Sequence, residues 1–292
     1  MVDAMLCVLD NQETILKRPV LYMKMSADWI KVQATMFTNK VVLITGASAG
    51  IGADTAIEFA KLDAKLVLTG RNKNNLEKIA FQCEENSPSN LKPLCVTGDI
   101  NVEGDVENLV KEAIDCYNQI DVLVNNAGII TIGSIETTSL EQYDSIFNTN
   151  VRAPYYLTML AAPHLIKSKG NIVNVSSIAG LRSFSGLLAY CMSKSTLDQF
   201  TRCVALELAS KGVRVNAVNP GTIDTGIYLR SGVSQEDHQK HLDKCKKTHA
   251  LGRTGTTKEV ANIIIFLASD AASNITGATL PVDGGRHAMC PR

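Results

Sequence analysis

The chain has 292 residues, of which 45% are hydrophobic and 20% are charged, so it can bury one large core near the upper size limit of a single domain. Its 29 Lys and Arg residues balance 29 Asp and Glu residues, and no basic block stands out, so neither nucleic acid nor an anionic membrane is indicated as a partner. No apolar run approaches the roughly 20 residues that span a bilayer. These features favour chemistry on a small molecule.

The eight cysteines are scattered and include no C-x-x-C pair. Several lie inside apolar runs, where free thiols pack as small hydrophobic side chains. This usage is typical of a reducing compartment, so we expect a cytoplasmic protein, with mitochondria as the alternative. The cysteines are Cys7, Cys83, Cys95, Cys116, Cys191, Cys203, Cys245 and Cys290.

Residues 1–37 do not share the pattern of the rest of the chain. They mix acidic and basic side chains, and Pro19 interrupts the one segment with helical potential. We therefore expect a poorly ordered N-terminal extension over 1–37, followed by one domain over 38–292.

From Lys40 onward, short apolar runs alternate with longer segments of helical periodicity, which is typical of parallel strands joined by crossover helices. The predicted fold is a single α/β domain of the doubly wound Rossmann type, with a seven-stranded, mostly parallel sheet and helices on both faces. The predicted strands are 41–45, 65–69, 93–97, 121–124, 171–175, 214–218 and 279–282. The predicted helices are 50–62, 76–86, 102–117, 140–165, 189–210 and 258–269.

A glycine-rich turn follows the first strand, with the sequence TGASAGIG from Thr45 to Gly52. Missing Cβ atoms let backbone approach a pyrophosphate, and the following helix N-terminus supplies free N–H groups. The spacing is G-x-x-x-G-x-G and differs from the standard G-x-G-x-x-G fingerprint. A plain turn is the alternative, which the strand before and the helix after disfavour.

The second strand is followed by Arg71 and Asn72, where a site selective for NAD usually carries an acid. A guanidinium matches the geometry of a 2′-phosphate, so Arg71 favours NADP(H), with NAD(H) as the alternative if this arginine is merely solvated. Asp99, after the third strand, is either an acceptor for an adenine amino group or a cap for the next helix. The Asn126-Ala127-Gly128 turn either lies along a cofactor or is only a turn.

Two further segments carry polar residues that need a reason. Asn150 lies inside a predicted helix, where asparagine is unfavourable, so a kink or a buried hydrogen bond is expected. The turn at 219–225, NPGTIDT, offers N–H groups and hydroxyls that can hold a nicotinamide and its phosphates, or it is merely a turn.

Tyr190 and Lys194 are four residues apart and share a helix face. A nearby ammonium favours a phenolate, so we expect the tyrosine pKa to fall below its ordinary ~10, as suits a general acid or base. Ser177 lies just beyond the end of the fifth strand, where its hydroxyl can reach the same cleft and donate to a substrate oxygen. The alternative for Tyr190 and Lys194 alone is a surface pair.

The segment 231–247 is the longest stretch without an apolar pattern, which suits a mobile lid over a substrate pocket, within about 222–254. His238, His241 and His249 occur in and just after it. Their spacing invites a metal, but no matching cysteine or carboxylate cluster accompanies them, so we expect a solvated face and no metal.

Seven motifs occur in the order typical of one family: TGASAGIG, Asp99, NNAG, Asn150, Ser177, YCMSK and NPGT. On these motifs the chain resembles the short-chain dehydrogenase/reductase family from about Thr38 to Gly285. Its pattern is similar to the 3-oxoacyl-[acyl-carrier-protein] reductases. The resemblance implies that 38–292 is a dinucleotide-binding catalytic domain and that the protein moves a hydride between NADP(H) and a ketone or secondary alcohol. One departure is Ala49, where many NADP-binding members have a basic residue.

The resemblance implies a catalytic tetrad in which Tyr190 is the acid or base, Ser177 polarises the substrate oxygen, Lys194 holds the nicotinamide ribose and Asn150 holds a water. It also implies a homo-oligomer, a tetramer or a dimer, formed by helices 140–165 and 189–210. The implied cofactor-binding residues are Thr45, Gly46, Ser48, Gly50, Ile51, Gly52, Arg71, Asn72, Asp99, Ile100, Asn126, Ala127, Gly128, Tyr190, Lys194, Pro220, Gly221, Thr222, Ile223 and Thr225.

The substrate is not fixed by these motifs. Ile178, Phe184 and Leu187 are expected near it, and their apolar character suggests a hydrophobic carbonyl compound. Two alternatives keep the fold but change the activity: a catalytically silent NADP(H)-binding regulatory or scaffold protein, and an isomerase or dehydratase.

Overall fold

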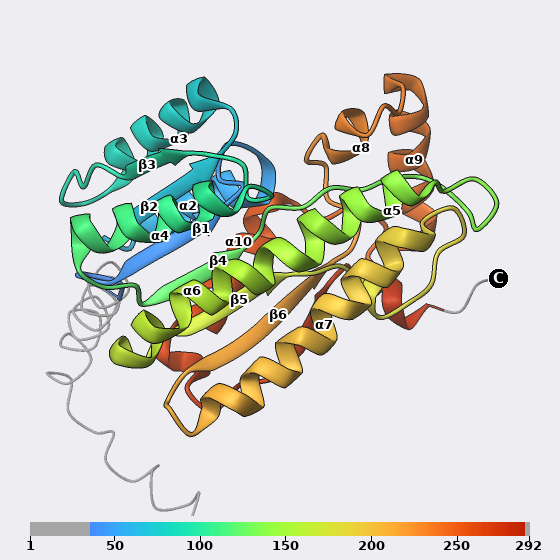
Figure 1. Ribbon diagram of the computed structural model, residues 1–292. Coiled ribbons are helices and arrows are strands. Elements are labelled where there is room, and N and C mark those ends of the chain that lie inside the picture. The colour runs from blue at the N-terminus through green and yellow to red at the C-terminus, as the bar shows by residue number, and fades with distance from the viewer. Residues whose placement is uncertain (1–35, 290–292) are drawn as a thin grey trace, which may run out of the picture.

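The structure, a computed structural model, describes residues 36–289 (Figure 1). Seven strands form one sheet in the order β3-β2-β1-β4-β5-β6-β7, and every neighbouring pair is parallel. The predicted doubly wound α/β fold is therefore confirmed, with a sheet that is parallel throughout. The strands are β1 Val41–Thr45, β2 Lys65–Gly70, β3 Leu94–Thr97, β4 Val122–Asn125, β5 Asn171–Val175, β6 Arg214–Pro220 and β7 Thr279–Val282.

Helices cover both faces of the sheet, because the crossovers of parallel strands must run over them. In Figure 1, α6 and α7 cross in front of the sheet and α10 lies behind it. The apolar residues of α2, α3 and α10 pack in one core cluster and those of α4, α6 and α7 in another. The crossover helices are α2 Gly50–Ala60, α3 Lys73–Asn86, α4 Glu103–Tyr117, α5 Leu140–Phe147, α6 Ala153–Ser168, α7 Leu188–Ala209 and α10 Thr257–Ala268.

Most of the predicted extension lies outside the described residues. Its last residue, Phe37, is 3% exposed, packs edge-on against Phe59 and donates its N–H to the carbonyl of Leu62. The core therefore includes Phe37, the last residue of the predicted extension.

The predicted helix 140–165 is interrupted by a π-helical turn, Asn148–Arg152, between α5 and α6. Asn150 lies at its centre and is fully buried. Its side chain exchanges hydrogen bonds with the backbone of Ile129, accepting from the N–H at 2.9 Å and donating to the carbonyl at 3.0 Å. Both expected features, an irregular helix and a buried hydrogen bond, are thus confirmed.

The predicted helices leave out 231–247, but the structure has the helix α9, Gln235–Thr248, over most of this segment, preceded by the short α8, Ile227–Arg230. Ser234 caps α9 by accepting the N–H of Asp237. Buried side chains in α9 are few, His238 and Cys245, so the apolar periodicity that marks a helix is absent. Figure 1 shows α8 and α9 beyond the ends of the strands.

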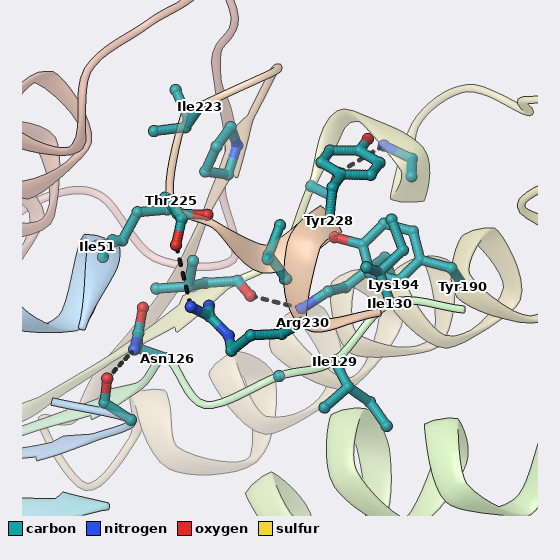
Figure 2. A pocket seen from close by; sticks show the side chains of 18 of the residues that line it. Ile51, Asn126, Ile129, Ile130, Tyr190, Lys194, Ile223, Thr225, Tyr228 and Arg230 are labelled. Carbon is teal, nitrogen blue, oxygen red and sulfur yellow. Dashed lines mark hydrogen bonds between the residues drawn. The ribbon is translucent and has the colours of Figure 1, made fainter. Parts of the chain in front are cut away.

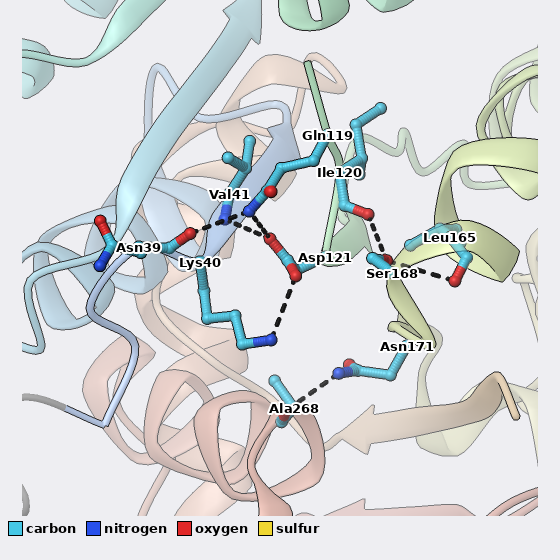
Figure 3. A network of polar contacts seen from close by, with 10 residues as sticks. All are labelled: Asn39, Lys40, Val41, Gln119, Ile120, Asp121, Leu165, Ser168, Asn171 and Ala268. Atoms are coloured by element: carbon cyan, nitrogen blue, oxygen red, sulfur yellow. Dashed lines mark hydrogen bonds and ion pairs between the residues drawn. The ribbon is translucent and has the colours of Figure 1, made fainter. Parts of the chain in front are cut away.

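A buried polar network fastens the opposite, amino-terminal edge of the sheet (Figure 3). The Asp121 carboxylate accepts the N–H of Val41 at 2.8 Å and amine and amide donors from Lys40 and Gln119. Asn171 donates to the carbonyl of Ala268 at 2.9 Å, which links β5 to α10. These residues join β1, β4 and β5 far from the carboxyl ends of the strands, so their role is structural.

The first prediction concerns this network. Asp121→Ala should lower the free energy of unfolding by about 1–3 kcal/mol, because the buried N–H of Val41 loses its acceptor. Urea unfolding followed by circular dichroism measures the change. Asp115→Ala, which removes only an exposed ion pair with Lys111, is the control and should change little. Equal losses in the two variants would show that the network is not a local anchor.

Candidate active site

A cavity of about 770 Å³ opens along the carboxyl ends of strands β1 to β6. This is the position where open α/β sheets bind ligands. Most of the site residues expected from sequence line it: Gly46, Ser48, Gly50, Ile51, Arg71, Asn72, Asp99, Ile100, Asn126, Ala127, Gly128, Ser177, Tyr190, Lys194, Pro220, Gly221, Thr222, Ile223 and Thr225. Thr45, Gly52 and Asn150 do not line the cavity but lie behind its wall.

The turn between β1 and α2 requires its glycines. Gly46 and Gly50 have positive φ angles of 65° and 59°, which side chains disfavour. A Cβ on Gly52 would clash with the Asn126 amide and lie 2.5 Å from the carbonyl oxygen of Gly46. No side chain caps the start of α2 and its first turn has no acid, so its N–H groups and the positive end of its dipole are free for a phosphate.

Thr45 and Asn126 hold this turn against the end of β4. The hydroxyl of Thr45 accepts the N–H groups of Asn126 and Ala127, each at 3.0 Å. The Asn126 amide donates to the Thr45 carbonyl at 2.8 Å. Thr45 is only 3% exposed, so its side chain supports the cavity wall and does not face a ligand.

The end of the cavity beside β2 and β3 carries Arg71 and Asp99. The guanidinium of Arg71 lies 3.8 Å from the carboxylate of Asp99, and the Arg71 side chain is 70% exposed. Asp99 accepts the N–H of Asn101, while α4 begins at Glu103 without a side-chain cap. The helix-cap alternative for Asp99 is therefore wrong. Asn72 caps α3 by accepting the N–H of Asn75.

Ser177 and Tyr190 bring their hydroxyls into the same cavity. The Ser177 oxygen accepts the N–H of Ala179, which fixes it just after β5. Burial raises the pKa of Tyr190 far above its ordinary value, against a hydrogen bond from Ser177 that lowers it. The pKa lowering expected from Lys194 is therefore wrong: the amine lies 5.8 Å from the centre of the Tyr190 ring and binds elsewhere.

Lys194 is buried, and its amine donates to the carbonyl of Val175 at 2.9 Å. Burial lowers the pKa of this amine to about 8, and attraction to Asp198 opposes the change. Asp198, 1% exposed, accepts from the Asn219 amide at 2.9 and 3.0 Å, and the same amide donates to the Ser177 carbonyl. This chain of contacts ties the lysine on α7 to the ends of β5 and β6.

Asn150 approaches Lys194 from behind the wall. Its amide donates to Ser193 at 3.0 Å in addition to its bonds with Ile129. A Cβ on Gly128 would lie 3.2 Å from the Asn150 side-chain oxygen and 3.5 Å from the Lys194 amine. Gly128 therefore keeps open a small space between the two polar groups.

The cavity is also lined by residues of α8, α9 and the C-terminal segment that no sequence motif indicated: Tyr228, Arg230, His241, Lys244 and Arg286. Tyr228 lies beside Tyr190 and Lys194 in Figure 2, which also shows Arg230 bonded to the carbonyl of Thr225. Asp198 was also missed, although it is four residues after Lys194, the spacing that identified Tyr190.

The expected solvated face for the histidines is also wrong. His238 is 8% exposed and contacts Asp224 at 3.2 Å. His249 is 3% exposed, with one ring nitrogen accepting the N–H of Thr222 at 3.3 Å. Within residues 36–289, no group of three or more His, Cys, Asp and Glu side chains is arranged to hold a metal ion.

Comparison with known proteins identifies the family. The family model described as enoyl-(acyl carrier protein) reductase matches residues 46–287. Meso-2,3-butanediol dehydrogenase of Serratia marcescens is 37% identical, covering 86% of this chain and 96% of that protein. The 3-oxoacyl-[acyl-carrier-protein] reductase of Thermotoga maritima is 35% identical, covering 85% of this chain and 97% of that protein.

Solved structures agree. A short-chain dehydrogenase/reductase of unknown function from Caenorhabditis elegans, solved with cofactor, has a TM-score of 0.82 and 34% identity, covering 87% of this chain and 97% of that one. Levodione reductase has a TM-score of 0.83 and 29% identity, and the match covers 87% of this chain and 100% of that one. The chain belongs to the short-chain dehydrogenase/reductase family. It is an oxidoreductase of alcohol and carbonyl groups, in a family that binds NAD(P)(H).

The glycine turn generates the second prediction. Gly52→Ala should weaken dinucleotide binding at least roughly tenfold, because the added methyl group forces Asn126 and Gly46 apart. Fluorescence titration with the reduced cofactor measures the dissociation constant. Gly104→Ala, whose Cβ would meet nothing within 4 Å, is the matched control. Unchanged cofactor affinity in Gly52→Ala would contradict the assigned cradle.

Proposed function

We propose that the protein interconverts a ketone and a secondary alcohol with NADP(H) as its preferred cofactor. The observation that carries this proposal is the meeting of the Ser177 and Tyr190 hydroxyls in the cavity that the glycine turn also lines. Three features suit a dinucleotide: glycines without side chains, an uncapped start of α2 and the wall formed by Asn126. When bound, the cofactor supplies the hydride that a carbonyl carbon accepts.

Tyr190 is the proposed general acid for reduction. Because burial raises its pKa, the phenol keeps its proton at neutral pH and can give it to the substrate oxygen. Ser177 donates a hydrogen bond to the same oxygen and stabilises the negative charge that develops there. In oxidation of the alcohol, the same two groups act in reverse.

Lys194 would hold the nicotinamide ribose hydroxyls and return a proton to Tyr190. Its pKa of about 8 suits this exchange near neutral pH. The Asn150 oxygen and the Lys194 amine both lie beside Gly128, which supports the expected water between Asn150 and Lys194. Asp198 and Asn219 position the lysine and do not touch the substrate.

The preference for NADP(H) rests on Arg71. Its ion pair with Asp99 is exposed and long, so the guanidinium is free to turn toward a 2′-phosphate at small cost. Asp99 remains the proposed acceptor for the adenine amino group. Ala49 supplies no second cation, which leaves NAD(H) as the alternative cofactor.

Two further proposals concern the setting of the enzyme. Large apolar side chains are exposed on α6 and α7, among them Tyr155 at 57%, Met159 at 51% and Leu206 at 82%, which supports a homo-oligomer formed through these helices. The cysteines from Cys83 to Cys245 are all free, which supports the cytoplasm or another reducing compartment. No helix within residues 36–289 is long and apolar enough to cross a bilayer.

The segment 222–254 remains the proposed lid over the substrate, now with α8 and α9 as its parts. Ile178, Phe184, Leu187 and Tyr228 line the cavity near Tyr190, which supports a substrate with a hydrophobic body. The intact set of hydroxyls and amine speaks against a silent scaffold. An isomerase or dehydratase would turn over substrate without net oxidation of the cofactor.

The third prediction tests the acid. Tyr190→Phe should lower kcat for ketone reduction by roughly 10²–10⁴-fold, because the substrate oxygen loses its proton donor, while cofactor affinity stays nearly intact. NADPH absorbance over a panel of ketones measures turnover. Tyr156→Phe, which removes an exposed hydroxyl bonded to Glu107, is the control. A Tyr190→Phe enzyme with the original kcat would reject the assigned acid.

The fourth prediction tests the cofactor preference. Arg71→Asp should lower kcat/KM for NADPH relative to NADH by roughly tenfold or more, because a charge-assisted phosphate contact is replaced by repulsion. Lys73→Asp, a charge reversal two residues away outside the cavity lining, should leave the ratio nearly unchanged. Equal efficiencies with the two cofactors in the original enzyme would already exclude the proposal.

A further inference from the structure

Charged side chains are unevenly distributed around the cavity. Among the described residues that line it, the acid is Asp99, at the end beside β2 and β3. The substrate end instead carries Arg286, Lys244 and His241. These three residues come from α9 and from the short 3₁₀ helix η5, Arg286–Ala288, so Lys244 and Arg286 bring positive charge to one place from two separate segments.

Arg286 is held in place but not neutralised. Its guanidinium donates to the Thr222 hydroxyl at 2.7 Å and lies 4.8 Å from the centre of the Phe184 ring. Within residues 36–289, no carboxylate lies within 4.0 Å of the Arg286 guanidinium or the Lys244 amine. The nearby Asp283 is engaged by the backbone N–H groups of Gly285 and His287 and by the His287 ring. Several guanidinium donors thus remain for a ligand.

The charges of Arg286 and Lys244 affect the pKa values of neighbouring side chains. Burial lowers the pKa of His241, and Arg286, His238, Lys244 and His249 lower it further. Burial raises the pKa of Tyr228, and Arg286 opposes that change. Tyr228 in turn is close enough to Tyr190 to influence its pKa. Arg286 is therefore separated from the Tyr190 hydroxyl by the side chain of Tyr228.

We propose that the carbonyl substrate carries an anionic group, a carboxylate or a phosphate, which Arg286 binds and Lys244 attracts at the mouth of the cavity. This inference rests on the proposed function and adds the substrate class: an oxo or hydroxy compound with an apolar body and one negatively charged end. The guanidinium fork matches both oxyanions, and its stacking on Phe184 fixes its direction. The anionic group is unchanged by the reaction, in which the carbonyl gains a hydride on carbon and a proton on oxygen.

The test uses matched substrates. Oxo acids of increasing chain length are compared with their methyl esters, and oxo phosphates with the corresponding neutral hydroxy ketones, by NADPH absorbance. The original enzyme should have at least roughly tenfold higher kcat/KM for the charged member of one pair, as expected for a hydrogen bond to a charged group. Which pair shows the preference identifies carboxylate or phosphate. Equal use of charged and neutral members in both pairs would overturn the inference.

Variants assign the effect to residues. Arg286→Met should raise KM for the charged substrate roughly tenfold or more, leave the neutral partner nearly unaffected and keep the cofactor dissociation constant; Arg286→Lys should recover part of the loss. Lys244→Met should raise KM for the charged substrate by a smaller factor. Lys247→Met, on the same helix but outside the cavity lining, should leave this KM unchanged. The assignment is wrong if Arg286→Met raises KM equally for the charged and the neutral substrate. It is also wrong if Lys244→Met has the same KM for the charged substrate as Lys247→Met.

The outcomes separate the two proposals. If no carbonyl compound, charged or neutral, oxidises NADPH, the proposed function itself fails. If neutral ketones are reduced at least as well as their charged partners, the function stands and the anion site is rejected.

Discussion

The site depends on one buried amine. Lys194 has almost no contact with solvent, so its charge is tolerated only because the Val175 carbonyl accepts its hydrogen bond and Asp198 lies close by. Asp198 is equally buried and is satisfied in turn by Asn219, whose amide also reaches the backbone of Ser177. One network of polar contacts therefore sets the relative positions of α7, β5 and β6, and with them the distance between the Ser177 and Tyr190 hydroxyls.

Polar residues have different roles at the amino-terminal and carboxyl ends of the strands. At the amino-terminal edge, the Asp121 network satisfies buried backbone groups and faces no cavity (Figure 3). At the carboxyl edge, polar groups line an open space, and glycines keep the backbone bare where a ligand must approach. The buried residues Thr45 and Asn150 stiffen this edge from behind, since their hydrogen bonds go to neighbouring backbone. A rigid frame around polar groups that face a cavity is typical of a preorganised site.

The cavity has two chemically different ends. One end meets Arg71 and Asp99, and the other meets an aromatic and cationic group built from α8, α9 and the segment after β7. The residues of the second group lie outside the family motifs themselves. Such segments vary without disturbing the sheet, which is why one fold can serve many substrates.

The sequence alone determined the strands, their parallel arrangement and many of the residues that line the cavity. Short apolar runs that alternate with helical segments predict parallel strands, and the motifs follow the carboxyl ends of these strands, where a parallel sheet brings its loops together. Asn150 could be recognised because asparagine inside a helix needs a buried partner, which Ile129 provides. The sequence therefore predicts the position of the cavity.

Only the tertiary structure decided the electrostatics and the substrate end. The spacing of Tyr190 and Lys194 says that they share a helix face, but not that burial dominates both pKa values or that the amine turns to Val175. Helix α9 has a single narrow buried stripe, so its sequence shows no apolar period and its histidines look solvated. Arg286 reaches the cavity from near the end of the chain, and no local pattern encodes a contact with Thr222, 64 residues earlier. Burial and long-range proximity are properties of the folded chain, so they become visible only when distant segments pack together.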